Sequence, residues 1–428
     1  MKNITLSEFI ENSPTPFHTI EFCRNILTSN GYIELFESND WDIKKGNKYF
    51  VTRNNSSIIA FITPFNSCDS FMLTASHSDS PSFKLKENFA LPDKNYIRIS
   101  TEKYGGMISS TWLDKPLGIA GRVILDNDGD ITSKLVNFEN IALIPNLAIH
   151  LTRNTNESTQ YNPAIDMLPI LSEDLNDKII TALSTSSDKI LSKDLFLYNQ
   201  QKPVVWGDYI SAPRLDDLQC AYSSIISLIE SDATDNSLPV CCIFDNEEVG
   251  SATKQGAAST FLEDTLERIS HFYMNSYSDY KKALANSFML SCDNAHAQHP
   301  NHPECTDNNN SVFINKGIVI KYNANQKYTT DSISAALFKT ICKMADVPYQ
   351  VYANRSDIAG GSTLGNISNT KVSINTVDIG LAQLAMHSSF ETAGITDIEY
   401  LIKALKIFYK KRILLKNNTY RIVECDYE

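Results

Sequence analysis

Short apolar runs that end in polar, reactive side chains recur along this chain of 428 residues. Continuous apolar runs of this length indicate strands that are buried in a sheet. The clearest runs, with the groups that follow each of them, are 71–75 with His77 and Asp79, 239–244 with Asp245 to Glu248, and 287–292 with Asp293. Reactive groups are therefore expected at the carboxyl ends of several buried strands.

Amphipathic patterns typical of helices alternate with these strands. We expect helices at 18–30, 218–230, 332–345 and 396–415, a helix that starts near Ser251, and further strands at 48–51, 57–63, 317–322 and 372–379. Gly31 ends the first helix, and Thr396 with Glu399 forms a capping box at the start of the last one. The alternation predicts a doubly wound α/β sheet, which binds ligands at the carboxyl ends of its strands.

The pattern of hydrophobic and polar residues changes between residues 91 and 205, where strand-like alternation appears. Strand-like segments at 122–125 and 134–136 flank the acidic stretch Asp126 to Asp130. A calcium loop is excluded there, because its glycine falls too early and Asn137 stands where the closing Glu belongs. A hairpin turn is expected instead. We therefore predict a mixed-sheet α/β domain formed by residues 1–90 and 206–428, interrupted by a β-rich domain at 91–205.

Composition narrows the classes of protein that this chain can be. The formal net charge of -12 disfavours binding to nucleic acid and to anionic membranes. No apolar run approaches the ~20 residues of a membrane span, and the N-terminus lacks the apolar core of a signal peptide. The nine cysteines include no Cys-x-x-Cys pair, so we expect reduced thiols in a cytoplasmic protein.

The acidic stretch after residue 244 is the centre of the candidate chemistry. Carboxylates crowded at the end of a buried strand repel one another, and a bound metal ion compensates their charge compactly. Two histidines and three carboxylates along the chain suit two zinc-like ions that share one carboxylate. The candidate ligands are His77, Asp216, Glu248, Asp293 and His387. Glu247 would remain free to act as general base, and Asp79 could fix the tautomer of His77.

Other interpretations of the same residues stay open at this point. An acidic loop that caps a helix would also explain Glu247 with Glu248, and paired Asp residues such as Asp216 with Asp217 are ordinary N-caps. A rival metal cluster at His296, His299 and His302 has helical spacing, but Pro300 and Pro303 indicate a loop there. His296 and His299 are expected instead to line a substrate site. The motifs Gly-x-Ser-x-Gly and His-Glu-x-x-His are absent.

Several longer segments resemble the aspartyl aminopeptidases, a family of co-catalytic zinc exopeptidases. The matching segments are 76–81, 115–122, 144–150, 213–217, 245–251, 293–301 and 383–388. They follow the family order across nearly the whole chain. One departure is Phe390, which stands where many relatives carry an Arg.

This resemblance implies a ligand set and a mechanism. One zinc ion would be held by His77, Asp216 and Asp293, and the other by Asp216, Glu248 and His387. Glu247 would be the general base, Asp79 would orient His77, and the Asp216–Asp217 peptide bond would be cis. The substrate would be a peptide, and Lys321 would contact its acidic N-terminal side chain.

The resemblance also implies an assembly. The larger unit would be a peptidase domain and the insert a dimerisation domain, with dimers assembled into a tetrahedral dodecamer. His150, from the insert, would reach the active site of a neighbouring subunit. Two alternatives are a related dinuclear amidohydrolase or deacylase, and a non-catalytic assembly or cargo protein on the same scaffold.

Overall fold

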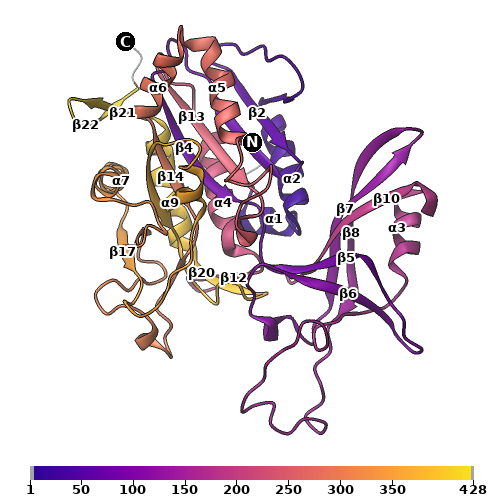
Figure 1. Cartoon of the computed structure of the whole chain (residues 1–428). Helices are drawn as coiled ribbons and strands as arrows, with labels where there is room; N and C mark the ends of the chain where they lie inside the picture. The colour runs from indigo at the N-terminus through magenta and orange to yellow at the C-terminus, as the bar shows by residue number, and fades with distance from the viewer. Residues whose placement is uncertain (1–3, 426–428) are drawn as a thin grey trace.

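A mixed sheet of nine strands forms the centre of the larger domain in the computed structural model, which describes residues 4–425 (Figure 1). Its strands, in spatial order, are β1 (Ile33–Leu35), β2 (Lys48–Arg53), β3 (Ser57–Ile62), β13 (Ser237–Phe244), β4 (Ser70–His77), β14 (Phe288–Cys292), β18 (Asn375–Gly380), β16 (Ile318–Tyr322) and β17 (Tyr349–Ala353). The central strands β13, β4, β14 and β18 run parallel, whereas β16 is antiparallel to β18. Parallel strands at the centre place their carboxyl ends at one common edge.

Helices cover both faces of this sheet. Strand β13 has apolar side chains on both faces of the sheet: its neighbouring residues Cys241 and Cys242 pack into different hydrophobic clusters. One face is covered by α1 (Leu6–Glu11), α2 (Pro16–Ser29), α4 (Leu215–Ile229), α7 (Ser332–Ala345) and α9 (Ile395–Tyr409). The other face is covered by α5 (Phe261–Tyr273), α6 (Tyr277–Ala285) and α8 (Leu364–Ser368). The predicted doubly wound α/β fold with a mixed sheet is therefore confirmed.

The inserted segment forms a closed antiparallel barrel beside the α/β domain (Figure 1). Its strands are β5 (Ser82–Leu91), β6 (Ile97–Tyr104), β7 (Leu117–Asn127), β8 (Asp130–Leu143), β9 (Ile170–Leu171) and β10 (Ile190–Asn199), with α3 (Leu175–Leu183) between the last two. The barrel has a hydrophobic cluster of its own, which includes Trp112 and Val123. Its first strand begins at Ser82, ahead of the predicted start at residue 91. The turn at Asp126 to Asp130 joins β7 to β8 as the predicted hairpin.

A second, five-stranded sheet lies at the carboxyl edge of the large one. It is built from β11 (Val204–Trp206), β12 (Tyr209–Ala212), β20 (Glu391–Gly394), β19 (Ala382–Leu384) and β15 (Ala295–His296). The turn between β19 and β20 carries His387, and β12 leads directly into α4. None of the helices within residues 4–425 combines the length and the apolar character that crossing a membrane requires.

Local structure differs from the prediction at two places. No helix begins at Ser251: its φ is +60°, its N–H donates to the Asn246 carbonyl, and the chain turns until α5. The last helix does not reach residue 415, because α9 ends at Tyr409 and a hairpin follows, β21 (Lys411–Lys416) with β22 (Thr419–Glu424). Asn417 and Asn418 both adopt positive φ, as the tight turn of such a hairpin requires.

The predicted capping box at the start of α9 is also wrong. The N-cap is Gly394, and no side chain of the helix satisfies its first amides. Asn315, from a distant loop, accepts a hydrogen bond from the Thr396 N–H at 3.1 Å instead. A tertiary contact therefore does what the local sequence pattern was expected to do.

Candidate metal centre

Three neighbouring strands bring the first candidate groups together. His77 is the last residue of β4, which pairs on one side with β13 and on the other with β14. Asp293 follows β14, and Glu247 with Glu248 form a 3₁₀ turn after β13. These side chains gather at one edge because the three strands run parallel. Their positions follow the local sequence closely.

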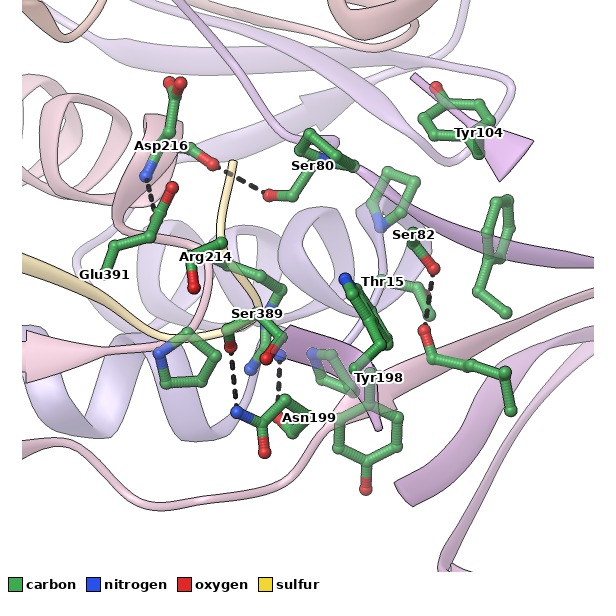
Figure 2. A pocket seen from close by; sticks show the side chains of 18 of the residues that line it. Thr15, Ser80, Ser82, Tyr104, Tyr198, Asn199, Arg214, Asp216, Ser389 and Glu391 are labelled. Atoms are coloured by element: carbon green, nitrogen blue, oxygen red, sulfur yellow. Dashed lines mark hydrogen bonds between the residues drawn. The ribbon is translucent and has the colours of Figure 1, made fainter. Parts of the chain in front are cut away.

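Asp216 and His387 reach the same place from other elements. Asp216 lies at the start of α4 with non-helical backbone angles, and the Asp216–Asp217 bond is cis, as the resemblance implied. The Glu391 carboxylate accepts hydrogen bonds from the N–H groups of Asp216 at 3.0 Å and of His387 at 2.7 Å. Figure 2 shows the first of these bonds, together with the bond from Ser80 to the Asp216 carbonyl. Glu391 therefore fixes two candidate ligands through their main chains.

The two carboxylate oxygens of Asp216 face different histidines. His77 Nε2 lies 3.5 Å from Oδ1, and His387 Nε2 lies 3.3 Å from Oδ2. His387 Nε2 is also 3.5 Å from Glu248 Oε1. In each of two sets, the possible ligand atoms lie within 4.8 Å of one another, and both sets contain Asp216: His77, Asp216 and Glu248 in one, and Asp216, Asp217 and Asp293 in the other.

The donor set fits divalent cations. Asp216 Oδ1, Asp217 Oδ1 and Glu248 Oε1 are buried and make no hydrogen bond within residues 4–425. A buried acceptor without a partner is costly, and more so when it carries charge. The Lys321 ammonium group faces a different acid of the site, with its Nζ 3.6 Å from Asp293 Oδ2. Cations held by these oxygens and by the two histidines would remove the deficit.

Asp79 organises the surroundings of the candidate ligands. Its carboxylate accepts hydrogen bonds from the N–H groups of Glu247 and Glu248, each at 3.1 Å, and from the Tyr104 hydroxyl at 2.7 Å. His77 Nδ1 lies 3.0 Å from the Asp79 carbonyl oxygen and 3.5 Å from its carboxylate. The main-chain oxygen is thus the nearer acceptor, and donation to it leaves His77 Nε2 free for a metal.

Proton affinities in the site follow from burial and from crowded charge. Burial raises the pKa of Glu247 to about 8, with His77 opposing this rise and Asp293 adding to it. Burial alone would lower the pKa of His387, but Asp216 and Glu248 raise it to about 10. Burial, with the charges of Asp79 and Asp245, raises the pKa of Tyr104, so its hydroxyl stays protonated. Metal binding to such groups competes with protons and is therefore pH-dependent.

The predicted substrate residues lie in different surroundings. Lys321 is 2% exposed, and its Nζ donates to the Asn294 carbonyl at 3.0 Å. The ring of His296 lies 6.4 Å from that of Tyr352, and desolvation and the charge of Lys321 lower its pKa. His299 is exposed and accepts a hydrogen bond from the Asn301 N–H. His150 is exposed in the long segment between β8 and β9 of the barrel.

The rival histidine cluster is not assembled in the described part of the chain. His299 and His302 have ring centroids 5.3 Å apart, and His302 pairs with Glu304 on the surface. Neither belongs to the two sets of residues that could hold an ion. The prolines therefore predicted this loop correctly.

Comparison with known proteins decides the family. Residues 9–409 match the model of the aminopeptidase I zinc metalloproteases (M18). This chain is an M18 zinc aminopeptidase. It is 43% identical over 423 residues to the "Probable M18 family aminopeptidase 2" of Clostridium acetobutylicum, covering 94% of this chain and 97% of that one. The corresponding Pseudomonas entomophila protein is 38% identical, with 96% and 99% covered.

Solved M18 structures share the whole fold. A chain in the structure of the Ape4 and Nbr1 complex superimposes with a TM-score of 0.90 at 35% identity, covering 94% of this chain and 84% of that one. The Saccharomyces cerevisiae mApe1 dodecamer gives 0.82 at 28% identity, with 95% of each chain covered. These matches support a zinc aminopeptidase, which is broader than the aspartyl aminopeptidase resemblance of the sequence segments.

The candidate site includes residues that the sequence did not predict. Asp217 lies beside Asp216 in an acidic pair that the sequence displays, yet only Asp216 was expected to bind a metal. Glu391 follows His387 by a few residues, but nothing local marks its contact with Asp216. Tyr104 comes from the barrel and carries no motif. It borders a pocket between the two domains, which Asp216 and Glu391 also line (Figure 2).

Proposed function

We propose that this M18 aminopeptidase uses two divalent ions, most simply zinc, and that Asp216 bridges them. One ion would be held by His77, Asp216 and Asp293, and the other by Asp216, Glu248 and His387. The observation that supports the bridge is that each oxygen of Asp216 faces a different histidine, at 3.5 Å and 3.3 Å. Asp217, whose buried Oδ1 has no hydrogen-bond partner, would be a further ligand of the ion that Asp216 and Asp293 hold.

We propose Glu247 as the general base. When bound, such ions polarise the substrate carbonyl and acidify a water molecule. Glu247 belongs to neither ion-holding set, and its main chain is fixed by the bond from its N–H to Asp79. Its side chain would accept the proton of the attacking water and deliver it to the amine of the departing peptide. A carboxylate held beside the reacting groups suits both roles.

We propose that acidic N-terminal residues are preferred and that Lys321 provides the cation which recognises them. The ammonium group of Lys321 is buried at the carboxyl edge of the sheet, beside Asp293, where a substrate side chain needs charge compensation. His296, which feels the charge of Lys321, would line the same subsite, and His299 would lie farther out. This preference is the narrower, aspartyl aminopeptidase form of the family activity.

Substrate panels test this specificity. Asp and Glu amides should be cleaved faster than Ala, Leu and Lys amides, and N-acylated amino acids should be inert. Faster cleavage of the N-acylated compounds would favour the deacylase alternative. Lys321→Met should slow the acidic amides while leaving the Ala amide much less affected. An equal loss on all substrates would show that Lys321 only neutralises Asp293.

Metal analysis tests the two-ion centre independently of substrate. The purified protein should contain two equivalents of zinc, and His387→Ala should reduce this content. One equivalent of zinc per subunit in fully active protein would refute the proposal that Asp216 bridges two ions.

We also propose a homo-oligomer, with dimers assembled into a tetrahedral dodecamer and His150 completing a neighbour's active site. The segment that carries His150 exposes Leu147, Ile149, Leu151 and Ile165, which is the kind of surface that another subunit covers. A solved relative is described as a dodecamer.

The absence of disulfides among the nine cysteines supports a cytoplasmic location.

Mixed oligomers test the role of His150. Glu247→Gln and His150→Ala subunits should each be inactive, yet their co-expression should restore part of the activity. Rescue is expected because one mixed interface pairs an intact base with an intact histidine. The test requires that co-expression or subunit exchange produces mixed oligomers, and light scattering must confirm that the protein is an oligomer. Confirmed mixed oligomers that remain inactive would rule out a contribution from the neighbouring subunit.

A further inference from the structure

The end of strand β6 carries the barrel domain into contact with the candidate metal centre. Tyr104 is the last residue of this strand, and Gly105 and Gly106 follow it. Each of these three residues touches a different part of the site, although none of them is a candidate ligand. The contacts are made within one subunit, so they do not depend on oligomerisation.

The Tyr104 hydroxyl acts on the turn that carries the base. It donates to Asp79 Oδ2 at 2.7 Å and accepts from the Asn246 side-chain amide at 2.8 Å. The Asp79 carboxylate in turn receives the N–H groups of Glu247 and Glu248. The Tyr104 hydroxyl, from the barrel, therefore fixes the Asp79 carboxylate, which in turn holds the main chain of both Glu247 and Glu248.

The two glycines act on the other side of the centre. The Gly106 carbonyl accepts from His387 Nδ1 at 2.5 Å, which leaves Nε2 facing Asp216 and Glu248. Gly105 has a φ of +74° and lies against Glu248. A Cβ at Gly105 would come within 3.1 Å of the Glu248 Cβ and 3.3 Å of its carbonyl oxygen. Only glycine combines this backbone conformation with so close an approach.

The barrel also holds the main chain around His387. The Ile108 N–H donates to the His387 carbonyl at 3.0 Å, and Thr111 Oγ1 accepts from the Ser389 N–H at 2.9 Å. Asn199 donates from its side chain to the Ser389 carbonyl at 2.8 Å (Figure 2). The ring and the backbone of His387 are thus both fixed by the inserted domain.

We infer that the barrel is a cis-acting part of the metal centre, in which residues 104–106 position Asp79, Glu248 and His387 for metal binding. This inference rests on the ligand set given under the proposed function. Tyr104 and Gly106 are positioning residues, because they act through Asp79 and His387 and do not contact the ions themselves. The insert therefore has a function in the isolated subunit, in addition to any function at an interface.

Zinc affinity tests this inference. Tyr104→Phe removes one hydroxyl and retains the ring that packs against Phe196. Loss of a group hydrogen-bonded to a metal ligand typically lowers metal affinity ~10–100-fold, and because Tyr104 acts one step farther out, through Asp79, we expect a reduction at the lower end, about 10-fold. The purified full-length protein would be stripped of metal, and zinc would be titrated against a competing chromophoric chelator. The visible spectrum of the cobalt-substituted protein should shift as well, since it reports ligand geometry.

Matched controls separate positioning from general stability. Tyr198→Phe removes a barrel hydroxyl whose hydrogen bond, donated to Asn137 at 2.6 Å, is about as short as that of Tyr104. This variant should leave zinc affinity unchanged. Gly105→Ala should weaken zinc binding, whereas Gly129→Ala, at a φ of +99° with nothing within 4 Å of the added carbon, should not. The glycine pair carries the test if Tyr104→Phe does not fold.

The outcomes distinguish this inference from the assignment beneath it. Wild-type zinc affinity and an unchanged cobalt spectrum in Tyr104→Phe and in Gly105→Ala would overturn the inference, whatever their melting temperatures. His387→Ala serves as the parallel test of the ligand set. If His387→Ala kept full zinc affinity, the ligand assignment itself would fail.

Discussion

Exchanging one glutamate at a time for glutamine should separate proton transfer from metal binding within a single turn. Glu247 and Glu248 are adjacent, and the N–H of each donates to Asp79 at 3.1 Å. Gln is nearly isosteric with Glu and preserves these main-chain bonds. Only Glu248 belongs to an ion-holding set, with Oε1 3.5 Å from His387 Nε2. Glu247→Gln should therefore affect chemistry, and Glu248→Gln should affect metal content.

The size of each effect follows from the surroundings of the side chain. Loss of a general base costs ~10²–10⁴-fold in rate, which corresponds to about 2.7–5.4 kcal/mol of transition-state stabilisation. Glu247→Gln also removes a buried carboxylate that His77 attracts and that Asp293 and Asp79 repel, so we expect little change in the stability of the fold. The Glu248 side chain is only 4% exposed, so Glu248→Gln withdraws a buried charge from the second ion and weakens its binding.

Three measurements on both variants test this separation. Zinc content after dialysis should stay at the wild-type value in Glu247→Gln and fall in Glu248→Gln. The kcat of Glu247→Gln should drop with little change in KM, while added zinc should partly restore Glu248→Gln. Near-normal turnover in Glu247→Gln, or zinc loss equal to that of Glu248→Gln, would refute the division of roles.

Three further predictions concern the surroundings of the centre and the stability of the fold. Glu391→Gln should lower both kcat and melting temperature, because the amide can accept only one of the bonds from Asp216 and His387; wild-type values in kinetics and calorimetry would contradict this. Burial and the charge of Arg214 lower the pKa of His18 from 6.5 to about 4. Between these two pH values the unfolded chain binds a proton that the folded chain does not, so the wild-type protein loses stability as the pH falls from 6.5 to about 4. His18→Gln should show a shallower decline of melting temperature there, and parallel curves would refute the assignment. Zinc removal by a chelator should lower the melting temperature and zinc should restore it, since ligand at a thousand times Kd stabilises by roughly 4 kcal/mol.

The parts of the site that sequence predicted best are those fixed by neighbouring residues. His77, Glu248 and Asp293 follow buried strands, and a parallel sheet brings such ends together without further information. The sequence marks Asp216 and His387 less specifically, because the acidic pair is also typical of an N-cap and the histidine follows no central strand. Only the family resemblance divided the candidate ligands between two ions. For Tyr104, no sequence signal exists, since its partner Asp79 is 25 residues away in another domain.

Local rules failed where distant groups replaced local ones. The start of α9 is satisfied by Asn315, so the Thr396 capping pattern had no role to fill. The hairpin after Tyr409 shows the opposite case, because the local pair Asn417 and Asn418 supplies the positive φ values that its turn requires.

The origin of the ligands gives the two domains different tasks in one centre. His77 ends β4, Asp293 follows β14 and Glu248 lies in the 3₁₀ turn after β13, so the buried parallel strands place these three candidate ligands. His387 comes from a turn with a left-handed backbone, φ +65°, a conformation that a histidine holds only when its surroundings impose it. Those surroundings are Glu391 from the α/β domain and residues 106–111 from the barrel. Removing the barrel would leave the His387 main chain held by Glu391 alone and would remove the acceptor of its ring Nδ1, so the barrel is needed to fix this candidate ligand.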